Sequence, residues 1–244
     1  MATFVLVAGA WHGGWCWQRV RPLLREAGHE VYTPTLTGSG ERVHLASPEI
    51  DFETHVTDVV NVVRFEDLYD VYLLGHSYSG FVTGAVAHRI PERNAHLIFL
   101  DALLPEDGKS PEQIYESHGQ HDFVQRVQRI VEQEGEGWYW PPPSPDAPNL
   151  RVADPDDQAW MEEKLTPHPM GTSNSVIRLG NPAADKIPRT YISCLPHPTG
   201  GLIPIFTAQV QNDPSWNYLE LQASHDPMIT DPDALTEVLI DIAS

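Results

Sequence analysis

The sequence predicts a doubly wound α/β fold, with a mostly parallel sheet and an inserted helical cap. Short apolar runs alternate with helical patterns over residues 1–105, and the same alternation returns over residues 189–244. Between them, residues 106–188 break the alternation with helical segments and a proline-rich stretch. A chain of 244 residues suits one large α/β domain. We therefore expect residues 1–105 and 189–244 to form the core, and residues 106–188 the cap.

The first predicted strand is Phe4 to Val7, whose four apolar residues leave no polar face. A glycine-rich loop follows, and then a helix from about Gln18 to Ala27 that closes at Gly28. The loop contains neither of the glycine patterns that bind dinucleotides or phosphates. It can instead fold over a neighbouring site and lend a backbone amide, and Ala10 is the candidate donor.

The chain centres on a strand, a tight turn and a helix between residues 71 and 88. Val71 to Leu74 is a buried strand by pattern, and Phe81 to His88 is a closely packed helix. The small residues between them form the kind of sharp turn that exposes a nucleophilic serine above a sheet. Ser77 is therefore the candidate nucleophile. The amide of Tyr78, at the start of the helix, is a candidate donor to an oxyanion.

The turn departs from the G-x-S-x-G pattern at its fifth position. Ser79 occupies that position, and the glycine follows one residue later at Gly80. Because serine is also small, we expect the close contact of strand and helix to survive with a slight displacement.

The remaining elements continue the alternation. The predicted strands are Glu30 to Pro34, Ala95 to Leu100, Arg189 to Cys194 and Trp216 to Leu221; the predicted helices are Phe52 to Phe65, Pro111 to Glu134, Asp156 to Lys164, about Ile205 to Val210, and Pro232 to Ala243. Ligands of parallel sheets bind beyond the carboxyl ends of the strands, where Ser77 and Asp101 both fall. His225 follows the last strand, which is where a hydrolase of this topology places its general base.

Aromatic residues are the candidates for a substrate pocket. Trp138 and Trp140 stand beside a rigid proline run in the predicted cap, and Trp11 lies in the glycine-rich loop. They suit a pocket wall, although the cap aromatics suit an anchor to the core equally well. His118 and His121 occur at helical spacing without a third ligand in register, so we expect no metal site.

Charge and cysteine content indicate which classes of partner and which cellular compartment to expect. The chain has 34 acidic and 15 basic residues and a formal charge of −19, which disfavours nucleic acid and anionic membranes as partners. It begins without a basic leader or an apolar run long enough to span a bilayer. Cys16 and Cys194 are isolated and read as core thiols in a reducing compartment. We expect a cytoplasmic protein; its oligomeric state is left open, with a homodimer among the alternatives.

Five stretches of the chain resemble one family: Phe4 to Trp15, Thr35 to Arg42, Gly75 to Gly80, Leu100 to Gly108 and Ser224 to Asp226. They resemble the α/β-hydrolases of the plant methylesterase and hydroxynitrile lyase group, and most closely its bacterial esterase-like members. The resemblance implies the α/β-hydrolase fold, with Ser77 as nucleophile, His225 as base and the amides of Ala10 and Tyr78 as the oxyanion hole. It implies no cofactor. The usual His-Gly before the oxyanion residue is Ala8-Gly9 here.

The third member of the triad departs further from the family. Plant members carry the acid after the strand that corresponds to Arg189 to Cys194. The loop in this chain, Leu195 to Gly201, contains no carboxylate. Asp101 is the best substitute, because it ends the strand after the nucleophile strand and some lipase-like relatives keep their acid there. The alternative is that Asp101 only caps a loop.

The predicted reaction is hydrolysis of a small, largely apolar or aromatic ester through an acyl-enzyme. One alternative is a carbon–carbon lyase of the hydroxynitrile type. Such relatives carry Thr or Asn where Gly9 stands, and the rubber-tree type carries Lys where Asp226 stands; both features are missing. The other alternative is a hydrolase-like ligand receptor without activity. Receptors of this kind have lost the serine or the histidine, and this chain has both.

Overall fold

A six-stranded parallel sheet forms the centre of the computed structural model, which describes residues 1–197 and 201–244. Its strands run in the order β2-β1-β3-β4-β7-β8. Their bounds are Thr3–Val7 (β1), Glu30–Tyr32 (β2), Val71–His76 (β3), Asn94–Leu100 (β4), Arg189–Leu195 (β7) and Asn217–Gln222 (β8). The order reverses between β1 and β3, which makes the carboxyl ends of these two strands the switch point of the sheet. The predicted fold class is confirmed.

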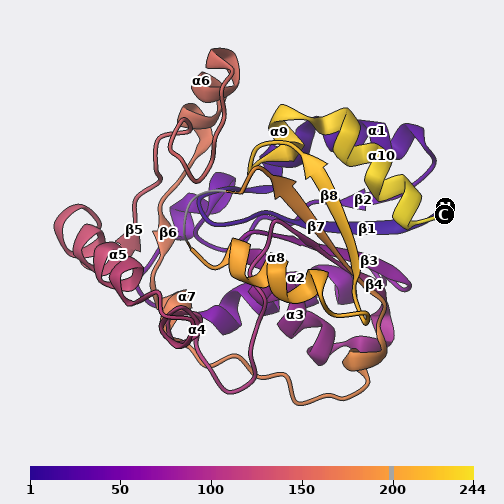
Figure 1. Cartoon of the computed structure of the whole chain (residues 1–244), viewed down its shortest axis with the longest axis horizontal. Helices are drawn as coiled ribbons and strands as arrows, with labels where there is room; N and C mark the ends of the chain where they lie inside the picture. The colour runs from indigo at the N-terminus through magenta and orange to yellow at the C-terminus, as the bar shows by residue number, and fades with distance from the viewer. Residues whose placement is uncertain (198–200) are drawn as a thin grey trace.

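Helices cover both faces of the sheet (Figure 1). One face carries α2 (Phe52–Phe65), α3 (Ser79–Arg89) and α8 (Ile203–Gln211); the other carries α1 (Val20–Glu26), α9 (Pro227–Thr230) and α10 (Pro232–Ile242). Alternate strand residues supply two apolar cores, since Val5 and Val7 join the first face while Phe4 and Leu6 join the second. Burial on both faces explains why the central strands β1 and β3 contain uninterrupted apolar runs.

Residues 111–174 contain a further group of elements, most of it at the left of Figure 1, and the chain that follows runs below the sheet toward β7. They comprise α4 (Pro111–Ser117), α5 (His121–Glu134), α6 (Pro155–Lys164), α7 (Gly171–Asn174) and a two-stranded sheet of β5 (Tyr139–Trp140) and β6 (His168–Pro169). Short 3-10 turns η1 (Gly14–Gln18), η2 (Gly40–Leu45), η3 (Pro91–Arg93) and η4 (Ala184–Lys186) complete the chain. In the part of the chain that the structure describes, no helix is both long and apolar enough to cross a membrane.

Two predicted helices differ from the observed ones. The predicted helix from Pro111 to Glu134 is two helices, α4 and α5, because Gly119 between them has a φ of +75°, which a continuing α-helix does not accommodate. The helix predicted from Gln18 to Ala27 is shorter and follows the 3-10 turn η1. The glycine-rich stretch before it therefore supplies a turn as well as a loop.

Candidate active site

Ser77 lies on a strained turn between β3 and α3. Its φ is +52°, in the left-handed region that non-glycine residues rarely occupy. Two backbone hydrogen bonds hold the turn: the Ser77 amide donates to the Leu100 carbonyl at 3.2 Å, and the Leu103 amide donates to the Ser77 carbonyl at 3.0 Å. Gly75 must be small, since a Cβ there would lie 2.3 Å from Thr83 Oγ1. The strand and helix therefore meet closely enough to present the Ser77 side chain at the end of the sheet.

Ser79 fits its unusual place in the turn because its side chain has both space and a partner. Its hydroxyl, fully buried, donates a hydrogen bond to the Ala8 carbonyl at the end of β1. Glycine is required at position 80 instead, because a Cβ on Gly80 would lie 2.2 Å from the Leu103 carbonyl oxygen. The shifted glycine is thus explained by close packing of α3 against the chain that leaves β4.

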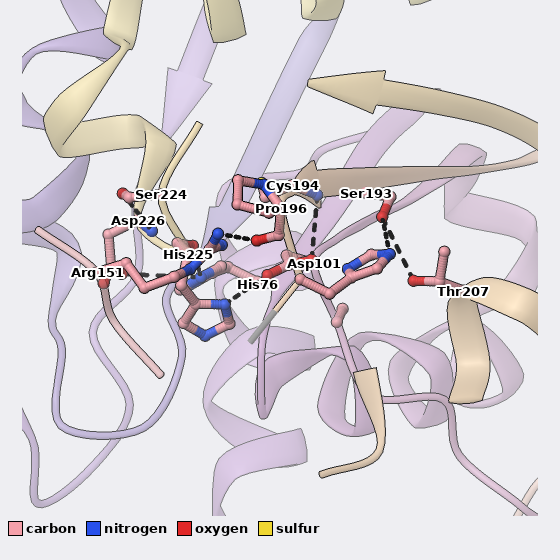
Figure 2. A network of polar contacts seen from close by, with 12 residues as sticks. His76, Asp101, Arg151, Ser193, Cys194, Pro196, Thr207, Ser224, His225 and Asp226 are labelled. Atoms are coloured by element: carbon pink, nitrogen blue, oxygen red, sulfur yellow. Dashed lines mark hydrogen bonds and ion pairs between the residues drawn. The ribbon is translucent and has the colours of Figure 1, made fainter. Parts of the chain in front are cut away.

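Asp101 and His225 meet at the carboxyl ends of β4 and β8 (Figure 2). Asp101 Oδ2 lies 2.7 Å from His225 Nδ1, and Asp101 Oδ1 accepts a hydrogen bond from the Cys194 amide at 3.1 Å. Asp101 is 0% exposed, and its φ of +41° turns the chain sharply after β4. Because an ionised carboxylate only accepts, His225 Nδ1 carries the proton. A neutral His225 ring then keeps a free lone pair on Nε2.

The surroundings of His225 favour its protonated form. Burial lowers the pKa of His225, but the hydrogen bond that His225 donates to Asp101 and the charges of Asp101 and Asp226 raise it, and the net direction is upward. Next to it, burial holds the pKa of His76 well below its usual value. His76 is thus neutral, and its Nε2 donates to the His225 carbonyl at 2.9 Å. The two rings differ in protonation behaviour because only His225 faces a hydrogen-bonded carboxylate.

The two candidate oxyanion donors belong to residues that line the same cavity as Ser77. Ala10 and Tyr78 both line the cavity that Ser77 and His225 line. Within residues 1–197 and 201–244, neither amide donates a hydrogen bond to another protein group. The loop that carries Ala10 packs tightly on the nucleophile turn, since a Cβ on Gly9 would lie 2.8 Å from the Cβ of Ser77. Glycine is therefore required there, and Thr or Asn could not occupy this position in the same geometry.

A cavity of about 690 Å³ opens over Ser77. Trp11 and Trp140 form part of its wall, with ring centroids 4.6 Å apart, and Trp11 Nε1 donates to the Trp140 carbonyl at 3.1 Å. The prediction for Trp138 is wrong: it does not line the cavity, and its ring packs against Tyr139 at 5.0 Å. Trp138 lies just before β5 (Tyr139–Trp140), so the alternation of side chains along that strand does not carry its ring to the side of Trp140.

Sequence reasoning missed several residues of the cavity wall. Tyr115 from α4 and Phe123 from α5 stack at 4.7 Å and line the cavity. His168 from β6 lies in the same wall, and burial lowers its pKa to about 3, so it is neutral. Tyr115 and Phe123 stand eight residues apart, and only knowledge of the break at Gly119 could have shown that they face each other.

The histidines of the cap do not form a metal centre. His118 Nε2 lies 2.7 Å from Glu106 Oε1, and His121 is exposed. Across the described residues, no group of three or more His, Cys, Asp and Glu side chains is arranged to hold a metal ion.

Comparison with known proteins finds relatives along the whole chain. Residues 4–238 match the model of the alpha/beta hydrolase family. The chain is 35% identical to a carbendazim hydrolyzing esterase from Nocardioides sp. (strain SG-4G), with 98% of each chain covered. It is 25% identical to methylesterase 9 from Arabidopsis thaliana, with 100% of this chain and 98% of the other covered.

Solved structures show the same fold. An extracellular alpha/beta-hydrolase from a Paenibacillus species superposes with a TM-score of 0.84 at 24% identity, covering 99% of this chain and 98% of the other. Its published description relates it to tobacco salicylic acid binding protein 2. The Arabidopsis methylesterase MES16 superposes with a TM-score of 0.78 at 22% identity, covering 100% and 99%.

Proposed function

Because the chain belongs to the alpha/beta hydrolase family, we propose that it is a serine esterase that hydrolyses carboxylic esters through an acyl-enzyme. The resemblance to plant methylesterases and bacterial esterases is confirmed, and these relatives support carboxylic-ester hydrolase activity. The observation that carries the finer proposal is the 2.7 Å contact between Asp101 Oδ2 and His225 Nδ1, beside the cavity that Ser77 lines. In this proposal Ser77 is the nucleophile, His225 the base and Asp101 the acid.

Acylation begins with attack of Ser77 Oγ on the carbonyl carbon of the ester. His225 Nε2 takes the hydroxyl proton as the new bond forms, and Asp101 stabilises the imidazolium without accepting a proton itself. The oxyanion accepts hydrogen bonds from the amides of Ala10 and Tyr78, which have no other partner among the described residues. When the intermediate collapses, the ester C–O bond breaks and His225 returns the proton to the departing alcohol.

Deacylation repeats these steps with water as the nucleophile. His225 Nε2 takes a proton from water, the hydroxyl oxygen attacks the acyl carbon, and the same two amides hold the second oxyanion. Collapse breaks the bond to Ser77 Oγ, which regains its proton from His225. The products are the carboxylic acid and the alcohol.

The substrate in this proposal is a small, largely apolar or aromatic ester. Four aromatic side chains of the cavity wall support this: Trp11, Trp140, Tyr115 and Phe123. Of the two histidines in the wall, His168 is neutral and adds no charge, while Arg126 and Glu134 contribute one side chain of each charge. We propose that residues 106–188 act as the cap, because they contribute Tyr115, Phe123 and Trp140 to this wall.

The test is a substrate panel combined with active-site variants. The wild-type enzyme should hydrolyse p-nitrophenyl and methyl aryl esters and should not cleave mandelonitrile, the lyase substrate. Ser77→Ala and His225→Ala should each lower turnover by several orders of magnitude. A serine-reactive phosphonate should label Ser77.

Other outcomes would point elsewhere. Turnover within tenfold of wild type in either variant would contradict the serine mechanism, and cleavage of mandelonitrile without ester hydrolysis would indicate the lyase. Labelling at Ser79 would show that the shifted glycine moved the nucleophile. The Ser79→Ala variant is the matched control, since it removes a neighbouring hydroxyl that the reaction does not use.

A further inference from the structure

A second buried carboxylate lies directly behind the proposed base. Asp226 follows His225 in the chain and is 0% exposed. Its Oδ1 faces two histidine rings, with His12 Nε2 at 3.4 Å and His76 Nε2 at 3.8 Å (Asp226, His76 and His225 in Figure 2). Among the described residues, neither oxygen of Asp226 accepts a hydrogen bond of good geometry. The reaction proposed above gives this carboxylate no role.

The hydrogen bonds of His12 determine which of its nitrogens carries a proton. His12 is 3% exposed, and its Nδ1 lies 2.8 Å from the Ala10 carbonyl oxygen. A carbonyl only accepts, so Nδ1 must be the donor. If the ring held only that proton, the Nε2 lone pair would face the Asp226 carboxylate. Two acceptors would then oppose each other in a fully buried site, which is strongly unfavourable.

Other groups around Asp226 do not supply the missing donor. His76 Nε2 already donates to the His225 carbonyl at 2.9 Å, a shorter contact than the 3.8 Å to Asp226. Asp101 accepts hydrogen bonds from His225 Nδ1 and the Cys194 amide and has no proton to donate to Asp226. The Asp226 amide donates to Ser224 Oγ, which brings no proton toward the carboxylate. Within the described residues, no Arg or Lys nitrogen lies within 4.0 Å of a carboxylate oxygen of Asp226. The two facing groups are paired if one further proton lies between them, either on His12 Nε2 or on the Asp226 carboxyl group.

This pair connects the two loops on which the chemistry depends. His12 holds the carbonyl of Ala10, the residue whose amide is the proposed oxyanion donor. Asp226 is the next residue after His225 in the sequence. The ring centroids of His76 and His225 are 4.7 Å apart. We propose that His12 and Asp226 share one buried proton and act as positioning residues, which fix the Ala10 loop relative to His225. The role in positioning rests on the proposed function; the shared proton does not.

The shared proton can be tested without any activity assay. Histidine labelled with ¹⁵N in the full-length protein reports which ring nitrogens carry protons, and the His12 signals are identified by their loss in His12→Gln. We expect either an imidazolium at His12 or the neutral Nδ1–H tautomer beside a protonated Asp226 carboxyl group, which the ¹³Cγ shift of labelled aspartate reports. A neutral Nδ1–H ring beside an ionised Asp226 would overturn the shared proton. A neutral His12 ring with its proton on Nε2 would overturn the proposal, because Asp226 would then be an ordinary acceptor.

The positioning role predicts a specific order among variants. In Asp226→Asn, the side-chain amide can donate to His12 Nε2, so His12 keeps its proton on Nδ1 and kcat should stay within about threefold of wild type. In Asp226→Ala that contact is lost, and kcat should fall by at least about tenfold with KM within about twofold. Affinity for a trifluoromethyl ketone, which forms a tetrahedral adduct with a serine, should fall in parallel with kcat/KM.

Controls separate this role from a general loss of structure. Asp231→Asn alters a nearby carboxylate, which accepts from the Thr230 hydroxyl at 2.6 Å, and should behave as wild type. Equal damage from Asp226→Asn and Asp226→Ala, wild-type kcat in Asp226→Ala, or a change confined to KM would each overturn the positioning role. Failure of the serine mechanism would appear separately, as activity retained in Ser77→Ala, and would leave the NMR result standing.

Discussion

Replacement of Asp101 by asparagine should disable the enzyme by reversing the tautomer of His225. The Cys194 amide donates to Asp101 Oδ1 at 3.1 Å and will keep the oxygen of an asparagine side chain at that position. The side-chain NH₂ group then takes the place of Oδ2, 2.7 Å from His225 Nδ1. Because NH₂ donates, Nδ1 must accept, and the ring proton moves to Nε2. His225 Nε2 can then no longer take the proton of Ser77.

The expected loss is about 10³- to 10⁴-fold in kcat, as for the equivalent change in other serine triads. This corresponds to about 4–5.5 kcal/mol of barrier height. The assay is steady-state hydrolysis of a p-nitrophenyl ester, with enzyme concentration set by phosphonate titration so that inactive protein is not counted. Thermal unfolding of the variant checks that the fold is kept.

The control is His197→Ala, which removes a ring near the same strand ends that contacts the Ser193 hydroxyl at 3.4 Å. It should cost far less, because this ring faces no carboxylate among its described contacts. Asp101→Asn with a rate within tenfold of wild type would refute the reasoning and would leave either a Ser-His pair or another carboxylate as the working arrangement.

Three further predictions follow from the described contacts. Since the base must be unprotonated and the pKa of His225 is raised, kcat/KM should fall on acidification through an apparent pKa above the ordinary value of about 6.5; a lower value would contradict the Asp101 contact. Trp140→Ala should raise KM for aryl esters by about tenfold, with little change for a short acetyl ester, because the ring forms part of the cavity wall. Gly80→Ala should destabilise the protein by about 2 kcal/mol or more in thermal or urea unfolding, whereas Gly180→Ala, with open space around it, should not.

Much of the core could be predicted because its central strands are buried on both faces. Four apolar residues in a row marked β1 and β3, and the order of strands and helices then brought Asp101 and His225 to one edge of the sheet. The cap was less predictable. The break at Gly119 depends on one backbone angle, and the side of β5 that faces the cavity depends on its pairing with β6.

The contact between His12 and Asp226 lies beyond what sequence patterns can indicate. The two residues are more than two hundred positions apart, and both sit in loops with no periodicity. Their meeting depends on how the loops after β1 and β8 fold across the end of the sheet. The residues around His12 and Asp226 in the sequence do not indicate that the two side chains meet, because a single histidine and a single aspartate are each common in loops.

In the proposed mechanism the catalytic acid, Asp101, follows β4, so the loop after β7 need not supply an acid. Residues 198–200 of that loop lie outside the described residues, but Gly201, Leu202 and Ile203 just beyond them line the cavity. This loop can therefore change in length and composition without removing a group that takes part in the chemistry. For laboratory evolution, it offers a segment where substrate scope and turnover can be altered independently, and randomised libraries would best begin there.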